Sequence, residues 1–272
     1  MKPIALLITV YNNQSGLEKT LLSLIPDSAL MDIVIVDDGS ALPVDLSKFS
    51  ELSIHLIRLP NNLGIETAAN MGLEYLYGCH YEFLARIDAG DVALNHRFSK
   101  QLAFLRENPA IGIVGSRINV VNTHGNLVFS TYHPIKDREI RNAMCFSNIL
   151  HHPTLMVRTD VMKKIGFYSP RFFATGDYDL CLRILKITKA ENMAEHLLNY
   201  EWDNQNSISN KTRRLQKMNA LKVQLLHFDK YNIYSYMGVL RSFIQIIFFV
   251  PKHLLRIENT CMRFMFRQGK QA

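Results

Sequence analysis

Residues 85–92 read Ala-Arg-Ile-Asp-Ala-Gly-Asp-Val and follow the apolar and aromatic residues 81–84. They bring two carboxylates, Asp88 and Asp91, together beside a glycine. A strand that ends in such a cluster suits a divalent cation, because Mg²⁺ takes one or two carboxylates and fills its other positions with water and phosphate oxygens. A solvated turn that carries acids is the alternative for this stretch in isolation, so the surrounding chain must decide.

Apolar runs elsewhere in the first half of the chain place this stretch in a sheet. Apolar runs at 4–10 and 31–36 indicate strands, and a third strand is expected at 54–59. Helical spacing of apolar residues over 15–25 predicts a helix between the first two strands, and a second helix is expected over about 65–77. Strands and helices that alternate in this way are typical of a doubly wound α/β fold, and uninterrupted apolar strands suit a parallel sheet covered on both faces.

Polar clusters follow three of these strands, at residues 9–12, 37–40 and 88–91. In open α/β sheets, ligands bind beyond the carboxyl ends of the strands, so the three clusters should meet along one crevice. The chain contains neither GxGxxG after the first strand nor GxxxxGK[ST]. This disfavours nicotinamide dehydrogenases and P-loop NTPases, and diphosphate binding would depend on side chains and a metal ion.

Six motifs occur in order over about residues 3–185, and together they resemble the family 2 glycosyltransferases of bacterial O-antigen and capsule gene clusters. The motifs are residues 8–12 (ITVYN), 34–40 (VIVDDGS), 62–64 (NLG), 86–91 (RIDAGD), 152–154 (HPT) and 176–180 (GDYDL). The resemblance implies the GT-A fold, a mostly parallel sheet flanked by helices, over residues 1–210. Its nucleotide-binding half would span about 1–115 and its acceptor half about 116–210, with a basic amphipathic helical tail over 211–272.

The resemblance also implies a nucleotide-sugar donor. A carboxylate accepts hydrogen bonds and cannot donate them, so Asp38 suits the imide N–H of uracil or thymine and favours UDP or dTDP. For Asn62 and Gly64 a purely structural turn is the alternative. Arg86 is placed to pair with the diphosphate. The implied donor-binding residues are Thr9, Tyr11, Asn12, Asp38, Asn62, Gly64, Arg86 and Asp88.

The metal prediction depends on a departure from the family pattern. Asp88 matches the first acid of the Asp-x-Asp motif, but the second position is Gly90. We expect Asp91 to take its place, so that Asp88 and Asp91 bind Mn²⁺ or Mg²⁺ directly or through water.

Relatives usually carry Glu-Asp at the last motif, where this chain has Gly176-Asp177. The resemblance implies that Asp177 is the general base, which would accept the acceptor's hydroxyl proton in an inverting displacement. Asp179 is predicted to cap the following helix. His152 and Trp202 are candidates for contact with the acceptor or the diphosphate, and ordinary packing is the alternative for both.

The net charge of +7 is concentrated in the tail. Residues 211–272 hold 12 Lys or Arg and two acids, which leaves 19 basic and 22 acidic residues in 1–210. No run of about 20 uncharged apolar residues is present, so a membrane-spanning helix is not expected. The polar residues of the apolar tail form one stripe, which predicts a helix in an anionic membrane interface; a tail that packs on the domain or forms a homo-oligomer is the alternative. The stripe comprises Arg241, Gln245, Lys252, Arg256, Asn259, Arg263 and Arg267.

Four scattered cysteines without a CxxC pair indicate a reducing compartment, and the apolar N-terminal run is short for a signal peptide. No nucleic-acid recognition motif accompanies the charge, so we expect no nucleic-acid partner. The prediction is a cytoplasmic enzyme on the inner face of the bacterial inner membrane, which glycosylates a lipid-linked saccharide during cell-surface polysaccharide synthesis. Gly90 and Gly176 prompt one alternative, a catalytically inactive sugar-nucleotide-binding or scaffolding protein.

Overall fold

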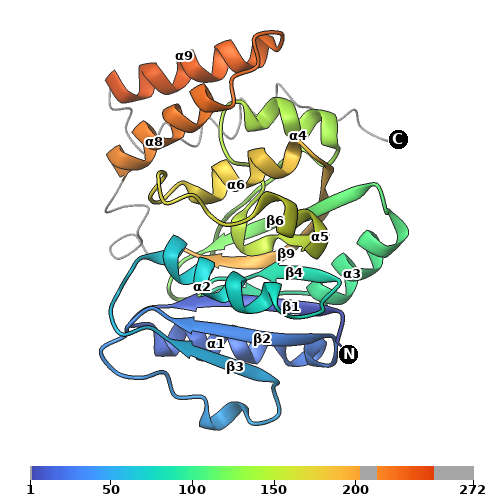
Figure 1. Cartoon of the computed structure of the whole chain (residues 1–272), viewed down its shortest axis with the longest axis vertical. Helices are drawn as coiled ribbons and strands as arrows, with labels where there is room; N and C mark the ends of the chain where they lie inside the picture. The colour runs from blue at the N-terminus through green and yellow to red at the C-terminus, as the bar shows by residue number, and fades with distance from the viewer. Residues whose placement is uncertain (1, 203–212, 248–272) are drawn as a thin grey trace.

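A computed structural model describes residues 2–202 and 213–247 (Figure 1). Its strands form one sheet in the order β3-β2-β1-β4-β8-β6-β9-β5, with β7 paired to β6. The strands are β1 (Ile4–Val10), β2 (Met31–Asp37), β3 (Ile54–Arg58), β4 (Phe83–Arg86), β5 (Val92–Ala93), β6 (Ile111–Val121), β7 (Leu127–Ser130), β8 (Met156–Arg158) and β9 (Lys189–Glu201). The helices are α1 (Gln14–Leu24), α2 (Ile65–Tyr77), α3 (Arg97–Glu107), α4 (Asp137–Met144), α5 (Thr159–Ile165), α6 (Gly176–Leu185), α8 (Arg213–Leu226) and α9 (Ile233–Ile247), and short 3₁₀ turns span Ile25–Leu30, Ser47–Phe49 and His152–Thr154.

The first half of the fold follows from the alternation of side chains along β1. Every residue of β1 is buried, because both faces of the sheet are covered. Ile4, Leu6 and Ile8 pack in one apolar cluster with α1, whereas Ala5 and Leu7 pack in the other with α2. The predicted strands and the two predicted helices are confirmed to within a residue or two.

The sheet changes character beyond β4. β3, β2, β1 and β4 are parallel, but β8 runs antiparallel to both β4 and β6, and β6 is parallel to β9. The predicted α/β fold flanked by helices is confirmed, and the sheet is parallel from β3 to β4 and mixed beyond β4. This arrangement brings the ends of β1, β2 and β4 to one edge.

The described part of the tail packs on the domain at the end farthest from β3 (Figure 1). In α8, Val223 is fully buried in the core, and Asn219 and Gln224 donate hydrogen bonds to the carbonyls of Phe173 and Phe146. This is the alternative considered for the tail, and it holds for α8. The proposed boundary at residue 210 lies outside the described residues.

Helix α9 faces the domain with its small residues. Ser235, Gly238 and Ser242 are buried, and a Cβ atom on Gly238 would lie 1.9 Å from the Cys145 carbonyl oxygen. The exposed large apolar residues of α9 are Ile233, Tyr236, Met237, Leu240, Phe243, Ile244 and Ile247. Within the described ranges, no helix is long and apolar enough to cross a membrane.

The prediction that the basic stripe of the tail faces a membrane is wrong for its first residue, Arg241. Arg241 donates a hydrogen bond to the Phe146 carbonyl at 2.8 Å, so this guanidinium faces the protein. The physical reason is that the carbonyl of Phe146 needs donors where α9 closes over it. Lys252, Arg256, Asn259, Arg263 and Arg267 lie outside the described residues.

Candidate active site

The ends of β1 and β2 are joined by Asn12. Its backbone N–H donates to the Ser40 hydroxyl at 2.8 Å, and its side-chain oxygen accepts from the Ala41 N–H at 2.9 Å. Asn12 has a positive φ of 49°, which asparagine tolerates better than most residues. Thr9 is buried at the end of β1, whereas Tyr11 is 49% exposed.

Asp38 connects β2 to the start of α2. Its two carboxylate oxygens accept hydrogen bonds from the backbone N–H groups of Leu63 and Gly64, at 2.7 and 3.0 Å. Each oxygen retains a second lone pair, so the carboxylate keeps acceptor capacity for a ligand. Gly64 has a φ of +90° and precedes α2, while Asn62 is exposed. Asp38 therefore fixes the loop that carries two other predicted donor-binding residues.

Arg86 lies buried at the end of β4, with one nitrogen shared between two predicted site residues. Its Nη2 atom lies 3.1 Å from the Asp88 carboxylate and 3.3 Å from the Thr9 hydroxyl. Its Nε and Nη1 atoms are buried and have no hydrogen-bond partner in the described part of the chain. Unused guanidinium donors in a crevice are suited to an anionic group such as a diphosphate.

Arg97 supports this strand end from behind and was missed by the sequence analysis. Its fully buried guanidinium donates to the carbonyl oxygens of Arg86 at 2.7 Å and Pro153 at 2.6 Å, and to the Gln101 side chain at 3.0 Å. Burial lowers the pKa of Arg97 to about 9, although the charge of Asp91 opposes this shift. No motif marks this residue, because an arginine at a helix start ordinarily indicates an exposed face.

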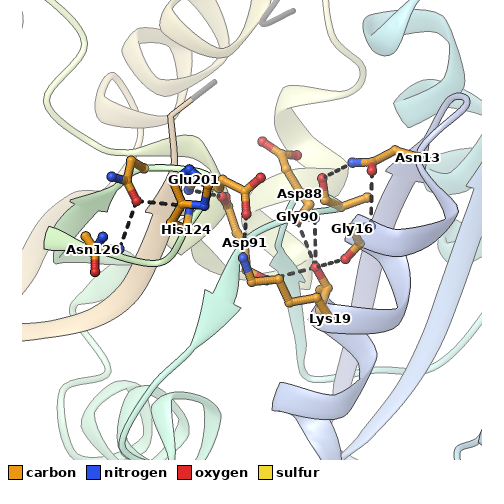
Figure 2. A network of polar contacts seen from close by, with 12 residues as sticks. Asn13, Gly16, Lys19, Asp88, Gly90, Asp91, His124, Asn126 and Glu201 are labelled. Carbon is orange, nitrogen blue, oxygen red and sulfur yellow. Dashed lines mark hydrogen bonds and ion pairs between the residues drawn. The ribbon is translucent and has the colours of Figure 1, made fainter. Parts of the chain in front are cut away.

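The Asp88–Asp91 turn is tied to α1 (Figure 2). The Asn13 side chain donates to the Ala89 carbonyl at 2.9 Å, and the Gly90 N–H donates to the Thr20 hydroxyl at 2.9 Å. Gly90 has a φ of +117°, so this turn favours glycine at the position where relatives carry an acid.

The two acids of the turn differ in environment. The Asp88 side chain is 31% exposed, whereas Asp91 is only 4% exposed. One oxygen of Asp91 accepts the Glu201 N–H at 3.1 Å, and the other is buried without a partner among the described residues. Burial, and then the charge of Asp88, raise the pKa of Asp91 well above its ordinary range.

These two carboxylates fit a divalent cation. Asp88 is partly accessible, and the orphaned oxygen of Asp91 accepts no hydrogen bond from the described residues, so a bound cation would favour its charged form. A Cβ atom on Gly90 would meet nothing nearer than 3.6 Å, so the space that an acid at 90 would use is open. In the ranges 2–202 and 213–247 no cluster of three or more acids, histidines or cysteines could hold a metal, so water and phosphate oxygens would complete the coordination.

His152 lies between Asp88 and a tyrosine. Its Nδ1 atom is 4.0 Å from the Asp88 carboxylate, and its Nε2 atom is 2.7 Å from the Tyr168 hydroxyl. Burial and the neighbouring Arg86 lower the pKa of His152, which favours a neutral ring. Tyr168 is a second residue that the sequence analysis missed, since no motif places it near the crevice.

Asp177 lies in the first turn of α6, where a helix N-terminus favours negative charge. The Asn148 side chain donates to its carboxylate at 2.8 Å, and its charge acts on His152. The prediction that Asp179 caps this helix is wrong, because Thr175 precedes the helix and Asp179 is buried in its first turn. Asp179 binds Arg183 at 2.8 Å and His227 at 2.9 Å.

Trp202 directly follows Glu201, whose backbone N–H donates to Asp91. It packs partly buried against the apolar cluster on the α1 side of the sheet, and its backbone N–H donates to the Val121 carbonyl. The structure thus brings Thr9, Arg86, Asp88 and His152 into one hydrogen-bonded or ion-paired set near Asp177. Asp38, Asn62 and Gly64 form a second set along the same edge.

The fold belongs to a known class. It is similar to the S. aureus protein TarS 1–349 in complex with UDP-GlcNAc, with a TM-score of 0.64, 16% identity, and coverage of 90% of this chain and 73% of that one. It is also similar to the mannosyltransferase PcManGT from Pyrobaculum calidifontis, in complex with GDP-Man and Mn²⁺, with a TM-score of 0.61, 13% identity, and coverage of 90% and 69%. The fold is GT-A, as the motifs implied.

The sequence comparisons identify the family within that class. The model of glycosyl transferase family 2 matches residues 5–166. The O-antigen biosynthesis glycosyltransferase WbnJ of Escherichia coli is 30% identical over 184 residues, which cover 65% of this chain and 70% of that protein. The amylovoran biosynthesis glycosyltransferase AmsE of Erwinia amylovora is 28% identical over 190 residues, covering 67% and 70%. The chain belongs to glycosyl transferase family 2.

Proposed function

We propose that this protein is an inverting glycosyltransferase of cell-surface polysaccharide synthesis. It moves a sugar from a nucleoside diphosphate donor, preferably a UDP or dTDP sugar, to a lipid-linked saccharide. The observation that carries the proposal is the position of Asp177, a carboxylate at a helix N-terminus beside Arg86, Asp88 and His152. The names of the O-antigen and amylovoran relatives support the kind of product.

On the donor side, Thr9, Tyr11 and Asn12 surround the base at the end of β1. Asp38 accepts from the base through its remaining lone pairs, and the unpaired donors of Arg86 bind the diphosphate. Asp88 and the unpaired oxygen of Asp91 would hold Mn²⁺ or Mg²⁺. When bound, the ion offsets the charge that develops on the nucleoside diphosphate leaving group.

On the acceptor side, Asp177 accepts the hydroxyl proton as the acceptor oxygen attacks the anomeric carbon. The bond from that carbon to the phosphate oxygen breaks on the opposite face, so one displacement inverts the anomeric centre. A sugar hydroxyl is a poor nucleophile at neutral pH, which is why a positioned base matters. His152 lies between this base and the metal-binding aspartate and contacts the acceptor or the diphosphate.

Replacing Asp177 by asparagine tests the base directly. The amide that D177N introduces keeps an oxygen that accepts the Asn148 side chain but cannot take a proton. Turnover should therefore fall about 10²-fold or more while donor affinity stays nearly constant. The matched control is Asp160→Asn on the exposed face of α5. Near-normal turnover of D177N in a radiolabelled-sugar transfer assay would exclude Asp177 as the base.

The second candidate, an inactive sugar-nucleotide-binding protein, is favoured by Gly90 and Gly176 standing where relatives carry acids. Titration calorimetry of the wild-type protein with UDP, with and without Mn²⁺, distinguishes the two. Metal-strengthened binding together with turnover supports the enzyme, whereas weak binding that ignores Mn²⁺, without donor hydrolysis, supports the binding protein.

We also propose that the enzyme works on the inner face of the bacterial inner membrane. The exposed apolar residues of α9 support this location, because an apolar face rimmed by polar groups is suited to a lipid interface. The basic residues of the last segment of the sequence add attraction to anionic lipid.

A further inference from the structure

Glu66 reaches from α2 into the loop that carries Asp177. It lies in the first turn of α2, and its Oε1 atom accepts the Ala174 N–H at 2.6 Å. Gly176 also lies against this side chain, because a Cβ atom built on it would lie within 4 Å of the Glu66 carboxylate. The Glu66 side chain therefore contacts two points at the start of α6.

This loop has a backbone that needs such support. Ala174 has a φ of +60°, a left-handed conformation that alanine rarely adopts. Conformations of this kind persist where surrounding groups hold them, and they cluster at functional sites. The hydrogen bond from Ala174 to Glu66 is one such restraint.

Because Gly176 has no side chain, the Glu66 carboxylate can lie against it. A Cβ atom built on Gly176 would lie 2.9 Å from the Glu66 Cγ atom and 3.5 Å from its Oε1 atom. A side chain at position 176 would therefore compete with Glu66 for the same space. The carboxylate that lies beside Asp177 comes from α2 instead of from residue 176.

The two carboxylates also interact electrostatically. Burial raises the pKa of Glu66, and the negative charge of Asp177 raises it further, against the backbone N–H groups that lower it. The charge of Glu66 is thus close enough to Asp177 to influence the group that we assign as the base.

The loop that leads into the same helical turn is held by Asp38. Asp38 accepts the N–H groups of Leu63 and Gly64, directly before Glu66. A Cβ atom on Gly64 would lie 3.7 Å from the Phe173 ring, so the two loops lie close together. The start of α2 therefore lies between Asp38 and the loop that carries Asp177.

We propose that Glu66 is a positioning residue for Asp177: by accepting the Ala174 N–H and packing against Gly176, it sets the base in place from the side of the molecule that carries Asp38. This inference rests on the proposed glycosyl transfer. It explains how a chain with glycine at position 176 keeps a carboxylate beside the base.

The first test compares Glu66→Ala with Glu74→Ala, a control on the exposed surface of the same helix. A misplaced catalytic group can cost about 10²-fold, so E66A should lower kcat roughly tenfold to a hundredfold with little change in the affinity for UDP. Glu66→Gln keeps the acceptor oxygen and should restore part of kcat. Hydrogen exchange at Ala174 and Gly176 should accelerate in E66A and stay unchanged in E74A.

The second test moves the carboxylate. Gly176→Glu alone should reduce kcat, because its side chain meets Glu66, while the double variant E66A/G176E should recover several-fold over E66A. Unchanged kcat and unchanged exchange in E66A would overturn the inference, as would a loss of thermal stability without any loss of kcat. Absence of transfer by the wild-type protein would refute the proposed function, and the exchange data would still report on the loop.

Discussion

Arg97 is a full positive charge held away from water by three acceptors. Its donors satisfy the carbonyl of Arg86, at the strand end that leads to Asp88, and the carbonyl of Pro153, which directly follows His152. The apolar substitution Arg97→Met would leave both carbonyls unpaired, and an unsatisfied buried group costs about 1–3 kcal/mol.

We expect R97M to lower the free energy of unfolding by about 3 kcal/mol or more in urea denaturation, because two such groups lose their donor, with Arg97→Lys between R97M and wild type. The control is Arg106→Ala, because the exposed ion pair of Arg106 with Glu82 should contribute less than about 1 kcal/mol. Equal losses in R97M and R106A would contradict the role given to the buried guanidinium.

His133 and His151 form a ring pair whose centroids lie 4.6 Å apart. Burial, and then Arg117, lower the pKa of His133 to about 4, and burial and His133 lower the pKa of His151 well below its ordinary range. In the unfolded chain the two histidines take up protons near pH ~6.5, whereas in the folded chain they do so only at lower pH. Stability from this pair is therefore present above about pH 6.5 and lost as the pH falls toward about 4.

Chemical denaturation at about pH 7 and about pH 5 checks this effect. Wild-type protein should lose on the order of 1–2 kcal/mol of unfolding free energy through these two rings, and His133→Gln should lose less. His80→Gln, on an exposed residue, should follow the wild-type pH dependence. Parallel curves for H133Q and wild type would contradict the assignment.

At the residue scale, the motifs predicted Asp88 and Asp177 as site residues. This was possible because the order of the motifs can be read from the sequence alone. They did not predict Arg97, Tyr168 or Glu66. Each of these acts on a partner from a distant segment, such as Glu66 on Ala174, and the sequence carries no local mark of that contact.

At the element scale, α9 packs closely on the domain because Gly238 has no side chain. Gly238 faces the Cys145 carbonyl, and a Cβ atom there would approach within 1.9 Å of its oxygen. Gly238→Ala must therefore push α9 outward, at a cost of about 1–3 kcal/mol for an overpacked contact. Thermal unfolding should show this loss for G238A and almost none for Leu240→Ala at an exposed position of the same helix, and equal melting temperatures would show that α9 adapts without cost.

Strands and helices of the nucleotide half were predictable because each is long and apolar on a face set by period 2 or 3.6. The orientation of α9 on the domain could not be predicted from the sequence. Periodicity shows that a helix has two faces, but which one contacts the domain depends on complementary surface elsewhere. Ser235, Gly238 and Ser242, three small residues on one face, were the available signal.

At the scale of the whole molecule, α8 and α9 form one end of the structure (Figure 1). The large apolar side chains of α9 are exposed there. We expect the full chain to co-sediment with vesicles that contain anionic lipid and to bind zwitterionic vesicles more weakly. Raising the salt concentration should weaken the binding, because it screens the electrostatic part.

The double variant Leu240→Ser/Phe243→Ser should reduce vesicle binding about tenfold or more, since burying each of these side chains is worth about 1.5–3 kcal/mol. Leu42→Ser, an exposed apolar residue far from α9 in the sequence, is the control. Equal binding by wild type and the α9 variant would place the membrane contact elsewhere.

The segment that begins at the Phe146 carbonyl connects this end of the molecule to Asp177. It accepts from Gln224 of α8 and Arg241 of α9, and Asn148, two residues later, holds Asp177. If α9 enters a bilayer as proposed, these contacts would hold Asp177 at a fixed height above the lipid. Under the proposed function, transfer would then be restricted to acceptor chains whose reactive hydroxyl lies at that height, and shorter or longer chains would not react.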